Sequence, residues 1–170
     1  CGAARREAGA GIDGSAVLAV GGGAVRLVAG GFRIRLMELL CLGLNHRTAP
    51  VEVRERFAVG LTKLGEASSE LVALAEASEG VVISTCNRTE FYLAAEDAQA
   101  AFLLVETRLA EKIHLDSSVA AHFYRKEKNE AARHLCRVVS GLDSMMLGET
   151  EIFGQVKHAY GSALQAGASG

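Results

Sequence analysis

The stretch VVISTCNRTEFY, residues 81–92, contains two short apolar runs with a polar tip between them. Residues 81–85 are rich in β-branched side chains, and residues 89–94 alternate between apolar and polar side chains. Both patterns are typical of β-strands, so the stretch predicts two strands joined by a tight connection at residues 86–88. The thiol of Cys86 would then be displayed at a loop tip instead of being buried.

Apolar periodicity on either side of this stretch predicts the rest of the fold. The expected elements are a strand at 38–44, a short helix at 51–58, a helix at 61–78, a helix at 98–112 and a strand at 119–125. Thr48 is expected to cap the short helix, with Pro50 in its first turn. With the short helix set aside as an insertion, the order strand, helix, strand, strand, helix, strand is the ferredoxin-like arrangement. We therefore predict an α+β fold, an antiparallel sheet with helices packed on one face.

Two further helices are expected after the sheet. Residues 128–142 carry an apolar stripe at helical spacing, and residues 152–166 look helical again. Gly141 and Gly148 bracket the loop between them.

Residues 1–36 differ from the rest of the chain, because nine of the 19 glycines lie there. The run GAGIDG at residues 9–14 matches a dinucleotide-binding pattern. No strand-like run precedes it and no helical periodicity follows, so we do not interpret it as a binding site. We expect residues 1–36 to be a non-native or disordered extension, with translation beginning at Met37.

Composition sets broad limits on function. The chain has 170 residues, 49% of them hydrophobic, which is enough for one domain with a proper core. A net charge of -2 gives no global basic signature, so any RNA contact must come from local patches. The four cysteines show no zinc-site spacing, so we expect no metal and a reduced, cytoplasmic setting. No apolar run approaches the length that spans a bilayer, so no membrane partner is expected.

Three blocks of sequence carry a resemblance to a known family. They are STCNRTE at residues 84–90, GLNHRTAPVEVRERFA at residues 43–58 and HLCRVVSGLDSMMLGETEIFGQVKHAY at residues 134–160. In this order they closely resemble the N-terminal catalytic domain of glutamyl-tRNA reductase. The resemblance implies that residues 37–150 form this catalytic domain. It also implies that residues 151–170 begin a helical connection to an NADPH-binding domain, which this chain lacks together with a dimerisation domain.

The resemblance also implies a reaction. The Cys86 thiolate would attack the ester that joins glutamate to tRNA and form a glutamyl-thioester. Hydride from NADPH would then give glutamate-1-semialdehyde, the first step of tetrapyrrole (porphyrin and haem) synthesis from glutamate. The implied partners are glutamyl-tRNA, a second copy of the full-length protein and the downstream aminomutase. The fragment alone is not expected to reduce anything.

Several residues near the tip match substrate-contacting positions of the family. Strand geometry would place Arg88 on the same face as Cys86, where it could bind a substrate carboxylate and favour the thiolate. Without the resemblance, Arg88 reads as a solvated loop arginine and Asn87 as a turn former. Thr85 and Asn87 are expected to contact the glutamyl group.

His134 lies on the shoulder of an apolar helical stripe, where a structural role would be the ordinary interpretation. In the family, the corresponding histidine is important for activity. It could move a proton to the departing ribose oxygen or shape the pocket, and both roles stay open.

A second group of expected substrate contacts lies near the end of the chain. Its members are Ser144, Glu149, Thr150, Glu151 and Gln155. The family's usual GEPQI is GETEI here, with Thr150 in place of proline and Glu151 in place of glutamine. A carboxylate at Glu151 should repel an anionic substrate group, unless it faces the substrate's amino group or points away. Without the resemblance, Gln155 would belong to a solvated helix face.

Two functions from other classes are alternatives. An RNA-binding module without chemistry would need exposed strand aromatics and a basic patch, and Phe91 and Tyr92 fall on opposite faces. A hydrolase using Cys86 and His134 would replace hydride with water. When the NADPH-binding domain is missing, hydrolysis is the main reaction that remains open to a thioester.

Overall fold

The computed structural model describes residues 16–20, 23–27, 36–113 and 117–170. The chain divides into two compact units, residues 1–36 and residues 37–170. In the first unit, β1 (Ala16–Val20) pairs antiparallel with β2 (Gly23–Leu27). This hairpin was not expected from the sequence pattern of residues 1–36. The run GAGIDG lies outside the described residues.

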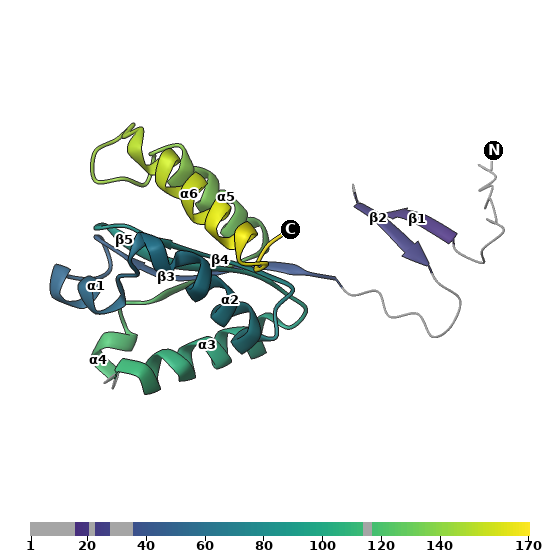
Figure 1. The fold of residues 1–170 in the computed structure, drawn as a ribbon, viewed down its shortest axis with the longest axis horizontal. Coiled ribbons are helices and arrows are strands. Elements are labelled where there is room, and N and C mark those ends of the chain that lie inside the picture. Colours follow the sequence, from purple (N-terminus) through teal and green to yellow (C-terminus); the bar gives the residue numbers. More distant parts are fainter. Residues whose placement is uncertain (1–15, 21–22, 28–35, 114–116) are drawn as a thin grey trace, which may run out of the picture. The chain divides into compact units, whose positions relative to one another are not determined.

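The second unit is the ferredoxin-like α+β fold that the periodicity predicted (Figure 1). Its sheet has the strand order β4-β5-β3-β6, and every neighbouring pair is antiparallel. The strands are β3 (Glu38–Asn45), β4 (Glu79–Ser84), β5 (Arg88–Ala95) and β6 (Tyr124–Glu127). The helices are α1 (Val51–Phe57), a 3-10 turn (Leu61–Lys63), α2 (Leu64–Ala75), α3 (Ala98–Ile113), α4 (Ser117–Ala120), α5 (Lys128–Val139) and α6 (Glu151–Gln165).

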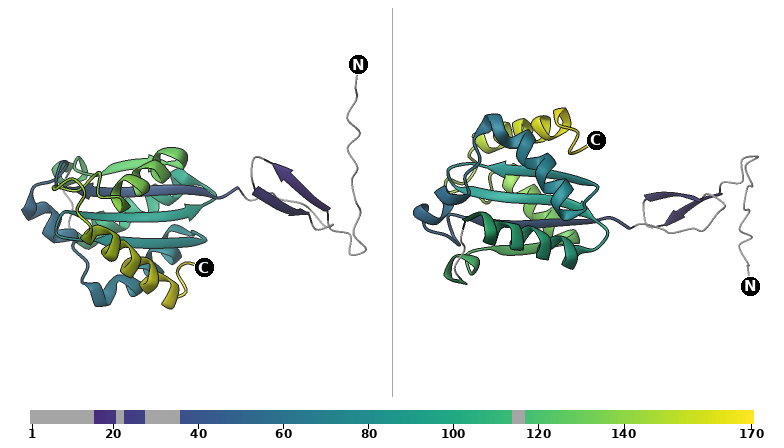
Figure 2. Two further views of the ribbon diagram at one scale, coloured as in Figure 1. Left: turned by 90° about the horizontal axis from the view of Figure 1, so that it is seen from above. Right: turned by 60° about the horizontal axis from the view of Figure 1, so that its bottom comes forward.

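Helices cover both faces of the sheet (Figure 2). On one face, Leu42 pairs with Phe91, and this apolar face packs against α2 and α3, as predicted. On the other face, Gly43 pairs with Glu90 and lies beneath α5. α6 packs along β4 and α2. The central strands are therefore buried on both sides, which is why β5 is buried at nearly every position.

Gly43 is needed for the polar face. A Cβ atom at this position would lie 2.7 Å from Cγ of Glu90 and 3.1 Å from the carbonyl oxygen of Thr89. Real Cβ atoms essentially never lie as close as 2.7 Å to another heavy atom, so a glycine at this position leaves space for the Glu90 side chain.

The expected strand at residues 119–125 is wrong at its N-terminal end. That segment begins with α4, and the amide of His122 donates to the carbonyl of Val119 in a turn. Val119 packs against Leu44 and Phe57 in a small second core, so its apolar character reflects a turn that is buried and not a strand. The strand starts only at Tyr124, which pairs with Gly43.

Two smaller expectations also need correction. Pro50, not Thr48, occupies the cap position of α1, and the Thr48 hydroxyl instead accepts from the amide of Asn45 at 3.1 Å. α5 ends at Val139, and Gly141 takes a positive φ of 71° that turns the chain out of the helix. Leu142 consequently lies in the loop and is 51% exposed.

In the parts of the chain that the structure describes, no helix is both long and apolar enough to cross a membrane.

Candidate functional site

The connection between β4 and β5 holds Cys86 at its tip. It consists of residues 85–87 and so lies one position earlier than expected, because β4 ends at Ser84 and Arg88 already belongs to β5. The amide of Thr85 donates to the carbonyl of Arg88 at 2.9 Å, and the amide of Asn87 donates to Oγ1 of Thr85 at 3.1 Å. These bonds fix the turn while the Cys86 side chain stays exposed and unpaired with another cysteine.

Hydrogen bonds from residues 46–54 hold this tip in place. The amide of His46 donates to the carbonyl of Asn87 at 2.9 Å. Arg54 of α1 donates from Nε to the carbonyl of Cys86 at 3.2 Å and from Nη1 to the carbonyl of Ala49 at 2.8 Å. A guanidinium therefore lies against the backbone of Cys86, a contact that the sequence pattern does not indicate.

His46 has an unusual environment beside the tip. Its Nδ1 is buried and has no hydrogen-bond partner among the described residues. Burial and the positive charges of Arg47 and Arg88 lower the pKa of His46, so its imidazole is neutral near pH 7. The unpartnered Nδ1 gives this histidine a hydrogen-bonding position that the described residues leave unused.

Arg88 is buried, which the sequence analysis did not predict. Its side chain is 2% exposed, and Nη1 donates to Oε1 of Glu90 at 2.6 Å. Nη2 donates to the carbonyl oxygen of Asp143 at 2.7 Å and to its Oδ2 at 3.2 Å. The guanidinium thus links the sheet to the loop between α5 and α6.

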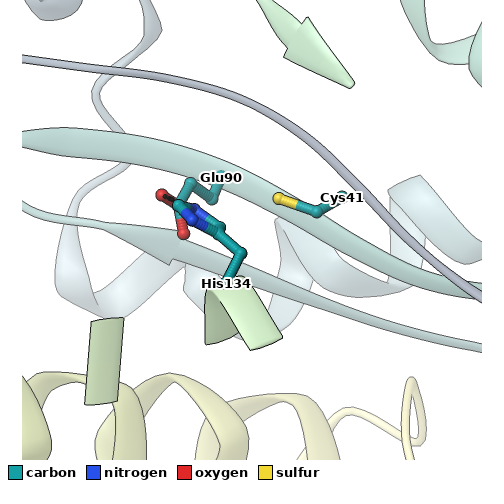
Figure 3. Close-up of side chains that lie close together, drawn as sticks. All are labelled: Cys41, Glu90 and His134. Atoms are coloured by element: carbon teal, nitrogen blue, oxygen red, sulfur yellow. Dashed lines mark hydrogen bonds and ion pairs between the residues drawn. The ribbon is translucent and has the colours of Figure 1, made fainter. Parts of the chain in front are cut away.

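Glu90 is the centre of a buried hydrogen-bond network. Its Oε1 accepts from Arg88, from the hydroxyl of Tyr124 at 2.5 Å and from Nε2 of His134 at 2.9 Å. Its Oε2 accepts from the hydroxyl of Tyr92 at 2.8 Å. Figure 3 shows His134 reaching from α5 to this carboxylate, with Cys41 beside it. An ionised carboxylate only accepts, so Nε2 of His134 carries the hydrogen and Nδ1 is the nitrogen left to exchange a proton.

The network sets the ionisation of Glu90. Burial alone would raise its pKa, but the bond from His134 and the charge of Arg88 prevail and lower the pKa to about 2. Burial and the nearby Glu90 raise the pKa of Tyr92, Tyr124 and Cys41. All three therefore stay protonated near neutral pH, so the Cys41 thiol is not a nucleophile.

Acid is expected to destabilise the fold through this carboxylate. Glu90 takes up a proton near pH 4.5 when unfolded but only near pH 2 when folded. Between these values the unfolded state binds more protons, so the free energy of unfolding falls as the pH is lowered, by on the order of a few kcal/mol in total. Urea unfolding at pH 5, 4 and 3 measures this, and Glu90→Gln should flatten the dependence. A profile as steep in Glu90→Gln as in the unmodified chain would contradict the assignment, and Glu66→Gln, an exposed carboxylate on α2, is the control.

Cys41, Glu90 and His134 also bear on metal binding, since their ligand atoms lie within 4.8 Å of one another. However, both oxygens of Glu90 and Nε2 of His134 are already used in hydrogen bonds, and the thiol is protonated. A metal ion would have to displace four donors from Glu90. The donor set fits a hydrogen-bonded core better than a metal centre.

A cavity of about 530 Å³ lies over the outer side of this network. His134 and Tyr124 line it together with Asn45, Arg47, Thr48, Lys126, Glu130, Arg133, Arg137 and Asp143. Cys86 is not in its wall. The tip nevertheless adjoins it, because Asn45 pairs with Arg88 across the sheet and the Asn45 side chain accepts from the amide of Arg47 at 2.9 Å.

The remaining predicted residues lie on the loop after α5 and at the start of α6. Ser144 is buried and Glu149 is partly buried, whereas Thr150 and Glu151 are exposed. Nε2 of Gln155 lies 3.5 Å from Oε1 of Glu151 on one helix face. Figures 1 and 2 show this loop and the β4–β5 turn at the same end of the sheet, and the Arg88 bonds to Asp143 tie them together.

Comparisons with known proteins agree with this fold. A family model described as "Glutamyl-tRNAGlu reductase, N-terminal domain" matches residues 42–170. A glutamyl-tRNA reductase of Akkermansia muciniphila is 52% identical over 134 residues, covering 77% of this chain and 38% of that protein. One of Geobacillus thermodenitrificans is 43% identical, covering 79% of this chain and 30% of that protein.

A solved structure, the glutamyl-tRNA reductase of Methanopyrus kandleri, superposes with a TM-score of 0.61 at 36% identity. The match covers 78% of this chain and 29% of that one. This chain thus spans about a third of the length of the relatives that it matches. On this evidence, the chain belongs to the glutamyl-tRNA reductase family and contains its N-terminal domain.

Proposed function

We propose that this chain is the acyl-accepting domain of a glutamyl-tRNA reductase, with Cys86 as the nucleophile. The thiolate sulfur forms a bond to the glutamyl carbonyl carbon, and the bond from that carbon to the ribose oxygen breaks. The glutamyl group remains on the protein as a thioester, and the ribose oxygen leaves with a proton. The observation that supports this best is the contrast between cysteines: Cys86 is exposed on a fixed turn, whereas Cys41 is buried and protonated.

His134 is proposed to carry the proton for the ribose oxygen: its Nδ1 takes up the proton that the Cys86 thiol releases and passes it to the departing oxygen. Its Nε2–H is held by Glu90, and Nδ1 has no hydrogen-bond partner among the residues that the structure describes. His134 also lines the cavity. A histidine oriented by a buried carboxylate through one nitrogen can exchange a proton through the other, so Glu90 acts as a positioning residue.

Arg88 is proposed to bind the substrate carboxylate, which requires that one of its present hydrogen-bond partners be displaced. One of its nitrogens is occupied by Glu90 and the other by Asp143. The Glu90 bond is buried, whereas the Asp143 side chain lies at the cavity wall and is shared with exposed Arg47 at 3.0 Å. We propose that a substrate carboxylate replaces the Asp143 carboxylate on Arg88.

The other predicted contacts complete the glutamyl site in this proposal. They are Thr85, Asn87, Ser144, Glu149, Thr150, Glu151 and Gln155. Because Glu151 is exposed and close to Gln155, it is free to face the substrate's amino group and not its carboxylate.

The reductive step belongs to the whole protein in this proposal. The described sheet of residues 37–170 is antiparallel throughout and offers no βαβ crossover of the kind that binds dinucleotides. We therefore assign no residue of this sheet to NADPH and derive no step through it. Reduction to glutamate-1-semialdehyde, dimerisation and contact with the aminomutase are proposals for the longer protein.

The burial of the strand aromatics argues against a non-catalytic RNA-binding module. Phe91 and Tyr92 are 8% and 4% exposed, so neither can stack on a base at the sheet surface. Hydrolysis remains the second candidate, because an exposed thioester at Cys86 would be open to water.

The test is capture of glutamate by the chain itself. Glutamyl-tRNA labelled in its glutamate is incubated with the protein at neutral pH without NADPH. We expect label that stays with denatured protein and is released by hydroxylamine, as a thioester would be. Unlabelled protein, in a sample shown to bind the tRNA, would contradict the proposal.

A further inference from the structure

The cavity beside His134 has an unusual charge for this chain. Four basic side chains line it against two acidic ones, although the whole chain carries a net charge of -2. The basic residues are Arg47, Lys126, Arg133 and Arg137, and the acidic ones are Glu130 and Asp143. Positive charge is therefore concentrated at one hollow instead of being spread over the surface.

Two of these four basic side chains have no direct ion-pair partner among the described residues. Arg47 pairs with Asp143 at 3.0 Å, and Lys126 pairs with Glu130 at 2.7 Å. Among the described residues, the guanidinium groups of Arg133 and Arg137 make no ion pair or hydrogen bond. They are four positions apart on α5 and so are neighbours on one helix face, where both are exposed. Two unpaired guanidinium groups side by side favour an anion with several acceptor oxygens.

The position of Arg133 and Arg137 indicates what kind of molecule carries the anion. His134 lies next to Arg133 on the same helix and points inward to Glu90. A cavity of about 530 Å³ is in the range of small-ligand sites. It is large enough for a single nucleotide.

We propose that Arg133 and Arg137 bind a phosphate group at the 3′ end of the substrate RNA. This inference rests on the proposed function and adds a subsite to it. Phosphate bound on the outer turn of α5 would hold the terminal ribose near His134 and direct the glutamyl ester towards the Cys86 turn. It also explains how a chain with negative net charge attracts RNA, since the attraction comes from a local patch.

The experiment compares RNA binding by three versions of the whole 170-residue chain. They are the unmodified chain, Arg133→Gln/Arg137→Gln, and Arg108→Gln as the matched control. Arg108 is an exposed arginine on α3 that lies outside this cavity, with its side chain 61% exposed. Affinity for glutamyl-tRNA is measured between 50 and 200 mM salt, and urea unfolding confirms that each variant is folded.

The double variant is expected to bind about tenfold more weakly at low salt. The slope of log affinity against log salt should fall by about 1, as for the loss of one phosphate contact. Arg108→Gln should leave both values unchanged. Equal affinities and slopes for all three proteins would overturn the inference.

A second substrate separates this inference from the proposed function. Glutamate esterified to adenosine without a 5′ phosphate should label Cys86 equally in the double variant and in the unmodified chain. If the double variant were labelled less than the unmodified chain, and to the same extent with this ester as with tRNA, a phosphate role would be contradicted. If no version is labelled by either substrate while the salt slopes still differ, the phosphate contact stands and the proposed nucleophile fails.

Discussion

Replacing Cys86 with alanine is expected to abolish glutamyl capture from glutamyl-tRNA, lowering its rate by at least about a thousandfold. The side chain is exposed on a turn that is fixed by backbone bonds, so its removal should leave the fold intact. The measurement is the rate at which label from glutamyl-tRNA enters the protein, together with the rate of glutamate release. Since release without NADPH would proceed through the same thioester, both rates should fall together.

Cys136 offers the matched control for this change. It is the other exposed cysteine among the described residues, and it lies on α5 and not on the β4–β5 turn. Cys136→Ala should therefore capture glutamate at the rate of the unmodified chain. If glutamyl capture survived in Cys86→Ala but disappeared in Cys136→Ala, the nucleophile would be Cys136, and the assignment to Cys86 would be wrong.

Replacing Arg88 with methionine is expected to destabilise the fold by roughly 3–5 kcal/mol. The guanidinium is buried, and its removal leaves the Glu90 carboxylate without its countercharge and Asp143 without its link to the sheet. Removing one partner of a buried ion pair costs this much because the other charge stays in a poorly solvated place. The free energy of unfolding in urea at pH 7 measures the effect.

Two comparisons make this prediction sharp. Arg108→Met removes an arginine of an exposed pair and should cost less than about 1 kcal/mol. Arg88→Met/Glu90→Leu removes both buried charges and should be more stable than Arg88→Met alone. If the double variant were less stable by the sum of the two single losses, the buried pair would not be coupled as described.

The sequence predicted the order of the elements because periodicity is a local property. β3, β5 and the helices α2, α3 and α5 all carry apolar repeats long enough to read directly. The turn at Cys86 was also predictable, since its polar residues interrupt two apolar strands. The predicted position of β6 is several residues too early in the sequence, because the apolar residues of a buried turn resemble a strand. The observed strand begins at Tyr124, which pairs with Gly43.

The environment of Arg88 could not be predicted in the same way. Its partner Asp143 is 55 positions further along the chain, and the donor His134 is 44 positions from Glu90. Such contacts depend on how α5 and its loop return to the sheet. One signal was present, because Arg88, Glu90 and Tyr92 recur at every second position and so form a polar stripe on one face of β5. A stripe like this within an apolar strand indicates a buried polar network and not a solvated arginine.

The most direct test of the account is to locate the captured glutamate in the unmodified chain. After brief reaction with glutamyl-tRNA without NADPH, the protein is digested at mildly acidic pH and its peptides are analysed by mass spectrometry. The account predicts a glutamyl adduct on Cys86, in the peptide that spans the β4–β5 turn, which hydroxylamine removes. An adduct on Cys136 instead, or an unmodified Cys86 in a protein that binds and deacylates the tRNA, would contradict it.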